Sequence, residues 1–143
     1  MPQRAKKGTP RAVVDTSVLV AGISGFRAPY VPGRNASADL LHRWAERSNF
    51  VWLVTEEILD EYKEVLRRLR VRHSLIGKVV NLIRERAEGI DIRSFMEISP
   101  DPKDDPFCIC SEHGKADFLV TLNPKDFPKD LLTAAVVGPE ELT

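Results

Sequence analysis

The chain has no excess charge of either sign and no long hydrophobic run. Its 143 residues carry 21 Lys and Arg against 21 Asp and Glu, so overall charge does not indicate a polyanionic partner. No apolar stretch approaches the roughly 18 residues of a membrane-spanning helix. Asp15 interrupts the apolar run after the basic segment 1–11, which does not fit a secretory signal. The sequence therefore predicts a cytoplasmic protein with no membrane partner.

The sequence also lacks metal-binding patterns of cysteine and histidine and glycine-rich phosphate-binding motifs. Cys108 and Cys110 stand two residues apart without metal-type spacing around them, so buried core positions are favoured over a zinc site. Neither G-x-G-x-x-G nor a P-loop occurs, which excludes the common phosphate loops. Ser17 has no His–acid context for nucleophilic catalysis. The histidines lack metal-ligand spacing: His42, His73 and His113.

What remains is the composition of an ordinary globular domain. With 43% hydrophobic and 29% charged residues, the chain can bury one sizeable core. Residues 1–10 are basic and without periodicity, and we interpret them as a flexible tail. Residues 11–143 show no linker or repeat, and we interpret them as a single domain.

Short apolar runs alternate along the chain with stretches of helical periodicity. The runs predict strands at 12–15, 50–54, 118–121 and 134–137, and a short strand within 90–98. Helices are expected after the capping residues Ser37, Thr55 and Asp104 or Asp105, with Gly89 ending one of them. This alternation predicts an α/β fold, a three-layer α/β/α sandwich with a central parallel sheet of four or five strands.

Three acidic points far apart in the sequence could converge on a metal. Asp15 directly follows a buried strand, at the kind of sheet edge where ligands bind in parallel α/β proteins. Glu61 lies in a glutamate-rich helix, and Asp104 lies in the acidic cluster 101–105. Mg²⁺ and Mn²⁺ prefer oxygen ligands, and either ion would relieve the repulsion between clustered carboxylates.

Each acid also has an ordinary structural interpretation. Asp15 could cap the helix that follows it, with Thr16 and Ser17 helping. Glu61 could be an exposed helix residue. Asp104 and Asp105 could be turn or cap residues beside prolines.

The basic residues gather in one part of the chain, between positions 63 and 86. Only two acids, Glu64 and Glu85, oppose eight basic residues there. A basic stretch beside an acidic pocket would guide a polyanion such as a nucleic acid onto bound metal, although solvated helical faces explain the same pattern equally well. The candidate residues for binding it are Arg67, Arg68, Arg70 and Arg72.

The order and spacing of these motifs resemble those of PIN-domain nucleases, with the branch of prokaryotic VapC-like toxins nearest. The resemblance covers roughly residues 11–142 and rests on the run VVDTSVLV at 13–20, TEEILDEY at 55–62, DPKDD at 101–105, GKADFLVT at 114–121 and VGPEEL at 137–142. It implies a PIN-like fold and a Mg²⁺- or Mn²⁺-dependent ribonuclease with Asp15, Glu61 and Asp104 as metal ligands.

The resemblance also marks a departure and several supporting residues. Where the family often has a fourth acid, this chain has Asn123, whose amide oxygen brings no charge, and Asp126 lies three residues on as a substitute. The residues expected to support the ligands are Thr16, Asp105, Thr121 and Asp126.

Two classes of function remain open from the sequence. The first is a ribonuclease, acting as the toxin of a toxin–antitoxin pair, with a cognate antitoxin protein as partner and a homodimeric assembly. The second is a non-catalytic module that binds RNA or protein, which Asn123 favours. The loop 22–36, with Arg27 and Arg34, could touch RNA or be an insertion with no role.

Overall fold

The computed structural model describes residues 8–27, 29–92 and 105–142. Residues 1–7 of the tail predicted at 1–10, and the predicted ligand Asp104, lie outside the described residues. No helix of the described part is long and apolar enough to cross a membrane.

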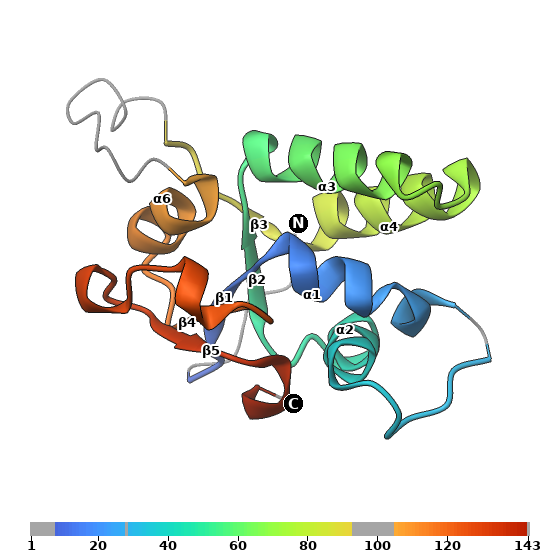
Figure 1. Ribbon diagram of the computed structural model, residues 1–143, viewed down its shortest axis with the longest axis horizontal. Helices are drawn as coiled ribbons and strands as arrows, with labels where there is room; N and C mark the ends of the chain where they lie inside the picture. Colours follow the sequence, from blue (N-terminus) through green and yellow to red (C-terminus); the bar gives the residue numbers. More distant parts are fainter. Residues whose placement is uncertain (1–7, 28, 93–104, 143) are drawn as a thin grey trace.

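Five parallel strands form one sheet in the order β3-β2-β1-β4-β5 (Figure 1). They are β1 (Arg11–Val14), β2 (Val51–Val54), β3 (Glu88–Gly89), β4 (Phe118–Val120) and β5 (Ala135–Val137). Val14 is in register with Val120, and Val120 with Val137, so the carboxyl ends of the three strands are level. The predicted α/β fold with a parallel sheet is confirmed.

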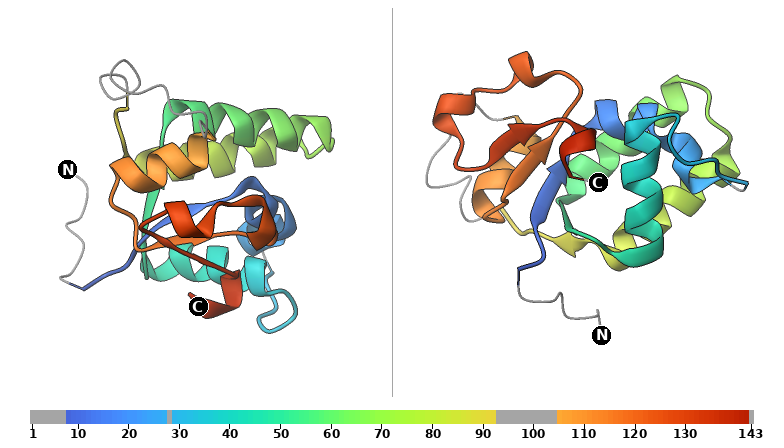
Figure 2. Two further views of the ribbon diagram at one scale, coloured as in Figure 1. Left: turned by 60° about the vertical axis from the view of Figure 1, so that its left-hand side comes forward. Right: turned by 90° about the horizontal axis from the view of Figure 1, so that it is seen from below.

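Helices cover both faces of this sheet. The α-helices are α1 (Thr16–Ala21), α2 (Ala36–Arg47), α3 (Glu56–Arg68), α4 (His73–Arg86) and α6 (Pro106–His113). The 3₁₀ turns are η1 (Ile23–Phe26), η2 (Pro124–Asp126), η3 (Lys129–Leu131) and η4 (Pro139–Glu141). Figure 2 shows α3 and α6 on one side of the strands and α2 on the other, which gives the three expected layers.

Some of the predicted helix ends are present in the structure and others are not. Thr55 caps α3 by accepting a hydrogen bond from the Ile58 amide, and Asp105 caps α6. The prediction that Ser37 caps α2 is wrong, since Asn35 accepts from the Ala38 amide and Ser37 lies inside the helix. Gly89 does not end α4, which stops at Arg86, and it belongs to β3 instead. The short strand β3 thus lies just before the predicted range 90–98, of which residues 93–98 fall outside the described residues.

Aromatic side chains fill the core between α2, α3, α6 and β2. Trp44, Trp52 and Tyr62 are each at most 1% exposed, and the Trp44 and Trp52 rings meet edge to face. The predicted core positions of the cysteines are confirmed, because Cys108 and Cys110 are both buried. Burial raises the pKa of the Cys110 thiol to about 12, so this thiol stays protonated and unreactive near neutral pH.

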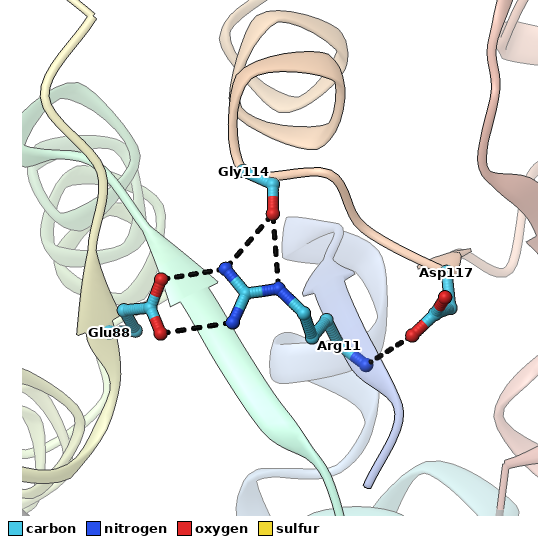
Figure 3. A network of polar contacts seen from close by, with 4 residues as sticks. All are labelled: Arg11, Glu88, Gly114 and Asp117. Atoms are coloured by element: carbon cyan, nitrogen blue, oxygen red, sulfur yellow. Dashed lines mark hydrogen bonds and ion pairs between the residues drawn. The ribbon is translucent and has the colours of Figure 1, made fainter. Parts of the chain in front are cut away.

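Arg11 ties together the amino edge of the sheet (Figure 3). Its guanidinium donates to both carboxylate oxygens of Glu88, at 3.0 and 2.6 Å, and twice to the Gly114 carbonyl. Its backbone amide donates to the Asp117 carboxylate at 2.9 Å. One side chain thus joins β1, the two-residue strand β3 and the end of α6.

The loop between α1 and α2 packs onto α2. The Tyr30 ring stacks on His42 with 4.2 Å between centroids, and the Tyr30 hydroxyl donates to Asp39. At Gly25 an added Cβ would lie 2.4 Å from the Ala38 carbonyl oxygen, so only glycine allows this close approach. Contact between this loop and RNA stays a prediction.

Candidate functional site

Asp15 lies at the carboxyl end of β1 and begins α1. Its backbone occupies the N-cap position, but its side chain caps no amide of that helix. The carboxylate oxygen Oδ2 instead accepts hydrogen bonds from the Ser17 hydroxyl at 2.7 Å and the Thr121 hydroxyl at 2.8 Å. The helix-cap interpretation of Asp15 therefore does not account for its carboxylate.

The two hydroxyls beside Asp15 are themselves fixed by the loop after β4. The Leu122 amide donates to Ser17 Oγ at 3.1 Å, and the Asn123 amide donates to Thr121 Oγ1 at 2.9 Å. Since each hydroxyl accepts from a backbone N–H, its single hydrogen is directed to Asp15. We call Asp15, Ser17 and Thr121 the hydroxyl bracket. It holds one oxygen of the carboxylate, and among the described residues no hydrogen bond engages the other.

Glu61 is brought to the same edge by α3. The Thr16 hydroxyl donates to Glu61 Oε2, which joins the residue after Asp15 to the middle of α3. The next residue, Tyr62, is fully buried, and its hydroxyl donates to the Val14 carbonyl at 2.5 Å. Burial raises the Tyr62 pKa well above its ordinary value, so the phenol remains a donor. Two consecutive residues of α3 therefore fasten it to the end of β1.

Neither carboxylate meets a cation within the described ranges. The ion pairs there join other acids, such as Asp60 to Lys63 and Glu56 to Arg84, and none includes Asp15 or Glu61. Carboxylate oxygens that are not paired with a Lys or Arg are the type of ligand that Mg²⁺ and Mn²⁺ prefer. In residues 8–27, 29–92 and 105–142 no group of three His, Cys, Asp or Glu is close enough to hold a metal. The predicted third ligand, Asp104, falls outside those ranges.

The other predicted support residues differ in what they contact. Asp105 Oδ1 accepts from the amides of Phe107 and Cys108, so this carboxylate caps α6. Asn123 is exposed, and its link to the site is its backbone amide. Asp126 is exposed in η2, and no contact between its side chain and Asp15 is recorded in the described part of the chain.

Ser17 is the site residue that sequence reasoning missed. Its lack of a histidine and acid partner ruled out a nucleophile, but its actual role is to donate to Asp15. A signal was present in the sequence: a hydroxyl two residues after an acid at a strand-to-helix junction is placed to bond that acid.

The predicted RNA-binding arginines lie beyond the site along α3 and in the turn to α4. Arg67 and Arg68 pair with Glu64. Arg68 follows Glu61 by seven residues, so it lies on the same helix face about 10 Å further along. Elsewhere in the basic segment, Arg86 is structural, since it donates to the Trp44 and Ala45 carbonyls at the end of α2. The basic residues between 63 and 86 therefore include a structural one, Arg86, and exposed ones that can contact a ligand, such as Arg67 and Arg68.

Comparisons with known proteins agree with this arrangement. A chain of the VapBC2 structure from Rickettsia felis, crystallised with a DNA fragment from the promoter, superposes with a TM-score of 0.50. The match covers 88% of this chain and 96% of that one at 14% identity, a likeness that shows the fold. No curated protein matches the sequence. Residues 11–125, from the first strand through the hydroxyl bracket, match the PIN domain. The chain therefore belongs to the PIN domain family.

Proposed function

We propose that the protein is a metal-dependent endoribonuclease whose site is the carboxyl edge of the sheet. One observation carries this proposal. Asp15 and Glu61 are each oriented by side-chain hydroxyls rather than by cations, in the described part of the structure. Negative charge that is positioned but not neutralised is what a divalent cation requires.

The residues of the site have separate roles in this proposal. Asp15 and Glu61 would hold a Mg²⁺ or Mn²⁺ together with Asp104. When bound, such an ion neutralises charge on the phosphodiester and lowers the pKa of water. Ser17 and Thr121 hold one oxygen of Asp15 and leave the other for the ion. Thr16 holds Glu61, and hydrogen-bonded ligands of this kind keep a metal site in shape.

RNA binding is proposed for the basic end of α3. Arg68 lies on the Glu61 face of the helix, so a phosphate held there would be directed along α3 toward the site. Arg67, Arg70 and Arg72 lie in or next to the same turn, and all three are exposed. Their contribution should weaken steeply as salt rises, because it depends on counterion release.

We further propose that this nuclease acts as the toxin of a toxin–antitoxin pair. The structural match comes from a VapBC2 complex bound to promoter DNA. By extension we propose a cognate antitoxin for this protein, action in the cytoplasm, and assembly as a homodimer. A small antitoxin-like reading frame directly upstream would support this role, and its co-expression should restore growth that this chain alone arrests. Arrest that persists, or never occurs, would contradict the toxin role without touching the nuclease chemistry.

The test of the nuclease is cleavage of a labelled mixed-sequence RNA with Mg²⁺, Mn²⁺ or chelator. Asp15→Asn should lower metal-dependent cleavage by more than about 100-fold, beyond the usual cost of losing a group that only orients a ligand. Its fold should remain intact or gain stability, since one repelling charge is removed. The matched control is Asp117→Asn at the amino edge, which should cleave at the wild-type rate. Wild-type cleavage by Asp15→Asn would contradict the site.

The alternative is a non-catalytic PIN module, and Asn123 is the observation that favours it. An uncharged residue at this position lowers the negative charge available for metal. Salt-dependent RNA binding with no turnover in any metal would support this alternative. Asn123→Asp should then create or increase cleavage.

A further inference from the structure

A hollow opens beside the candidate metal site, at the carboxyl ends of β4 and β5. Its volume is about 320 Å³, at the lower end of pockets that bind small molecules, about 300–1,000 Å³. Thr121 forms part of its wall, and the hydroxyl of this same residue donates to Asp15. Thr121 therefore belongs both to the wall of the hollow and to the hydroxyl bracket. We call it the β5 pocket.

The wall of the β5 pocket combines apolar surface with acids. Leu122 is 46% exposed, one of the few large apolar side chains of the described residues that face solvent, and it lines the pocket with Val137. Pro139 contributes a further apolar side, and two acids, Glu140 and Glu141, also line the pocket. A nucleobase would fit such a wall as a ligand, because its flat faces can pack on the apolar side chains while N–H groups on its edge donate to the carboxylates.

Glu141 is held in place rather than free in solvent. Its Oε2 accepts from the Gly138 amide at 3.2 Å, while its own amide donates to the Gly138 carbonyl at 3.1 Å. These reciprocal bonds fix the carboxylate at the turn η4. A carboxylate has about four acceptor positions, so it can still accept from a ligand.

Two lysines line the β5 pocket or the hollow next to it, and we expect them to meet the phosphates of a bound strand. Lys129 lines the β5 pocket and also the adjoining hollow of about 390 Å³, where Lys125 is a second cation. Single-stranded RNA is bound by such pairing of a base-stacking surface with cations along the backbone. The carboxylates that line the pocket repel phosphate but can accept hydrogen bonds from a base, so we expect the pocket to bind the base of a nucleotide rather than its phosphate.

We propose that the β5 pocket is a subsite for one nucleobase of single-stranded RNA beside the scissile phosphate, and that it prefers guanine. Guanine presents two adjacent N–H donors on its Watson–Crick edge, which a single carboxylate such as Glu141 accepts together. Adenine, cytosine and uracil do not present that adjacent pair. The inference rests on the proposed function in taking RNA as the ligand.

The test uses binding without metal, so it does not depend on cleavage. Wild-type protein in chelator is titrated with the four 5′-ribonucleoside monophosphates and with ribose 5-phosphate, while methyl signals of Leu122 and Val137 are followed by NMR. GMP should shift both and bind at least about tenfold more tightly than UMP or ribose 5-phosphate, the value of one hydrogen bond to a charged group.

Two variants separate the apolar wall from the carboxylate. Glu141→Gln keeps an acceptor for the Gly138 amide and should reduce the preference for GMP to less than about threefold. Leu122→Ala should weaken all four nucleotides alike. The control Leu69→Ala removes a leucine of similar exposure, 54%, at the far end of α3, and should change nothing.

The outcomes distinguish this inference from the proposed function. Nucleotides that move neither methyl, or bind no better than ribose 5-phosphate, overturn the pocket. A basic peptide that shifts these methyls when nucleotides do not would overturn it as well, and identify a protein-binding surface. Selective GMP binding by a protein that cleaves no RNA would leave the pocket standing and contradict only the nuclease.

Discussion

The two edges of the sheet treat their carboxylates in opposite ways. At the amino edge, Glu88 faces the guanidinium of Arg11. At the carboxyl edge, Asp15 and Glu61 face hydroxyls, and no cation of the described residues reaches them. The same residue types thus serve stability at one edge and leave unneutralised charge at the other.

This difference shows how to separate a functional acid from a structural one. Glu88 is neutralised by the protein itself, since hydrogen bonds from Arg11 hold the pKa of Glu88 below its ordinary value. An acid that is oriented but not neutralised leaves its charge for a ligand to complete. By this criterion Asp15 and Glu61 are candidates for function, and Glu88 is not.

The largest expected effect is on stability in the presence of metal. Mn²⁺ at about 100 times its dissociation constant should stabilise wild-type protein by about 2.7 kcal/mol, because it binds only the folded site. Asp15→Asn should lose this gain, and Glu88→Gln should keep it. Thermal unfolding with and without Mn²⁺ measures both. Equal stabilisation of all three proteins would remove the distinction between the edges.

Loss of the Tyr62 hydroxyl should have the next largest effect. Tyr62→Phe leaves the Val14 carbonyl and the Trp52 indole N–H without their buried partner, at a cost of about 1–3 kcal/mol. Chemical denaturation measures this cost. Because Tyr62 fastens α3 beside Glu61, metal affinity should fall too. A stable variant with unchanged metal affinity would show that α3 is positioned by packing alone.

Removing one hydroxyl of the bracket should have a moderate effect on metal binding. Ser17→Ala should weaken Mn²⁺ binding by about tenfold, the lower range for groups that orient a ligand. Thr121 would still hold the carboxylate. Titration calorimetry gives the affinity, and Ser24→Ala, an exposed serine of η1, is the matched control. No change in Ser17→Ala would assign the orientation of Asp15 to Thr121.

The smallest effect is expected at the amino edge. Glu88→Gln should cost less than about 1 kcal/mol near pH 7, since the ion pair with Arg11 is partly exposed. The folded-state pKa of Glu88 is lowered, so its stabilisation is present above the unfolded value of 4.5 and lost as pH falls through the folded value. Unfolding curves of the two proteins should therefore converge in acid. A difference that persists there would show that hydrogen bonds, not charge, hold this edge.

The fold was predictable because its signals are local. Apolar runs such as 51–54 are buried strands whichever neighbours they take, and the cap at Thr55 depends on residues three positions away. β3 was not predicted, since its two exposed residues, Glu88 and Gly89, carry no apolar pattern. Its position depends on Arg11, which is 77 residues distant.

The site was predictable in part for the same reason. Asp15 and Glu61 could be placed from strand ends and motif spacing. The family resemblance also named Thr16 and Thr121 as supporting residues. Which carboxylate each of them bonds could not be predicted, since Thr121 lies 106 residues from Asp15 and Thr16 lies 45 residues from Glu61. Ser17 lies two residues from Asp15, but its hydroxyl is directed by the distant Leu122 amide. Orientation by distant partners is therefore what the structure adds.

The most direct test of the contrast between the edges is paramagnetic broadening of backbone amide signals by a trace of Mn²⁺. Asp15, Ser17, Glu61 and Thr121 should broaden first in the wild-type protein and recover in Asp15→Asn. Arg11, Glu88 and Asp117 should stay sharp in both. Equal broadening at the two edges, or broadening unchanged in Asp15→Asn, would contradict the claim that only the carboxyl edge is built to bind a metal.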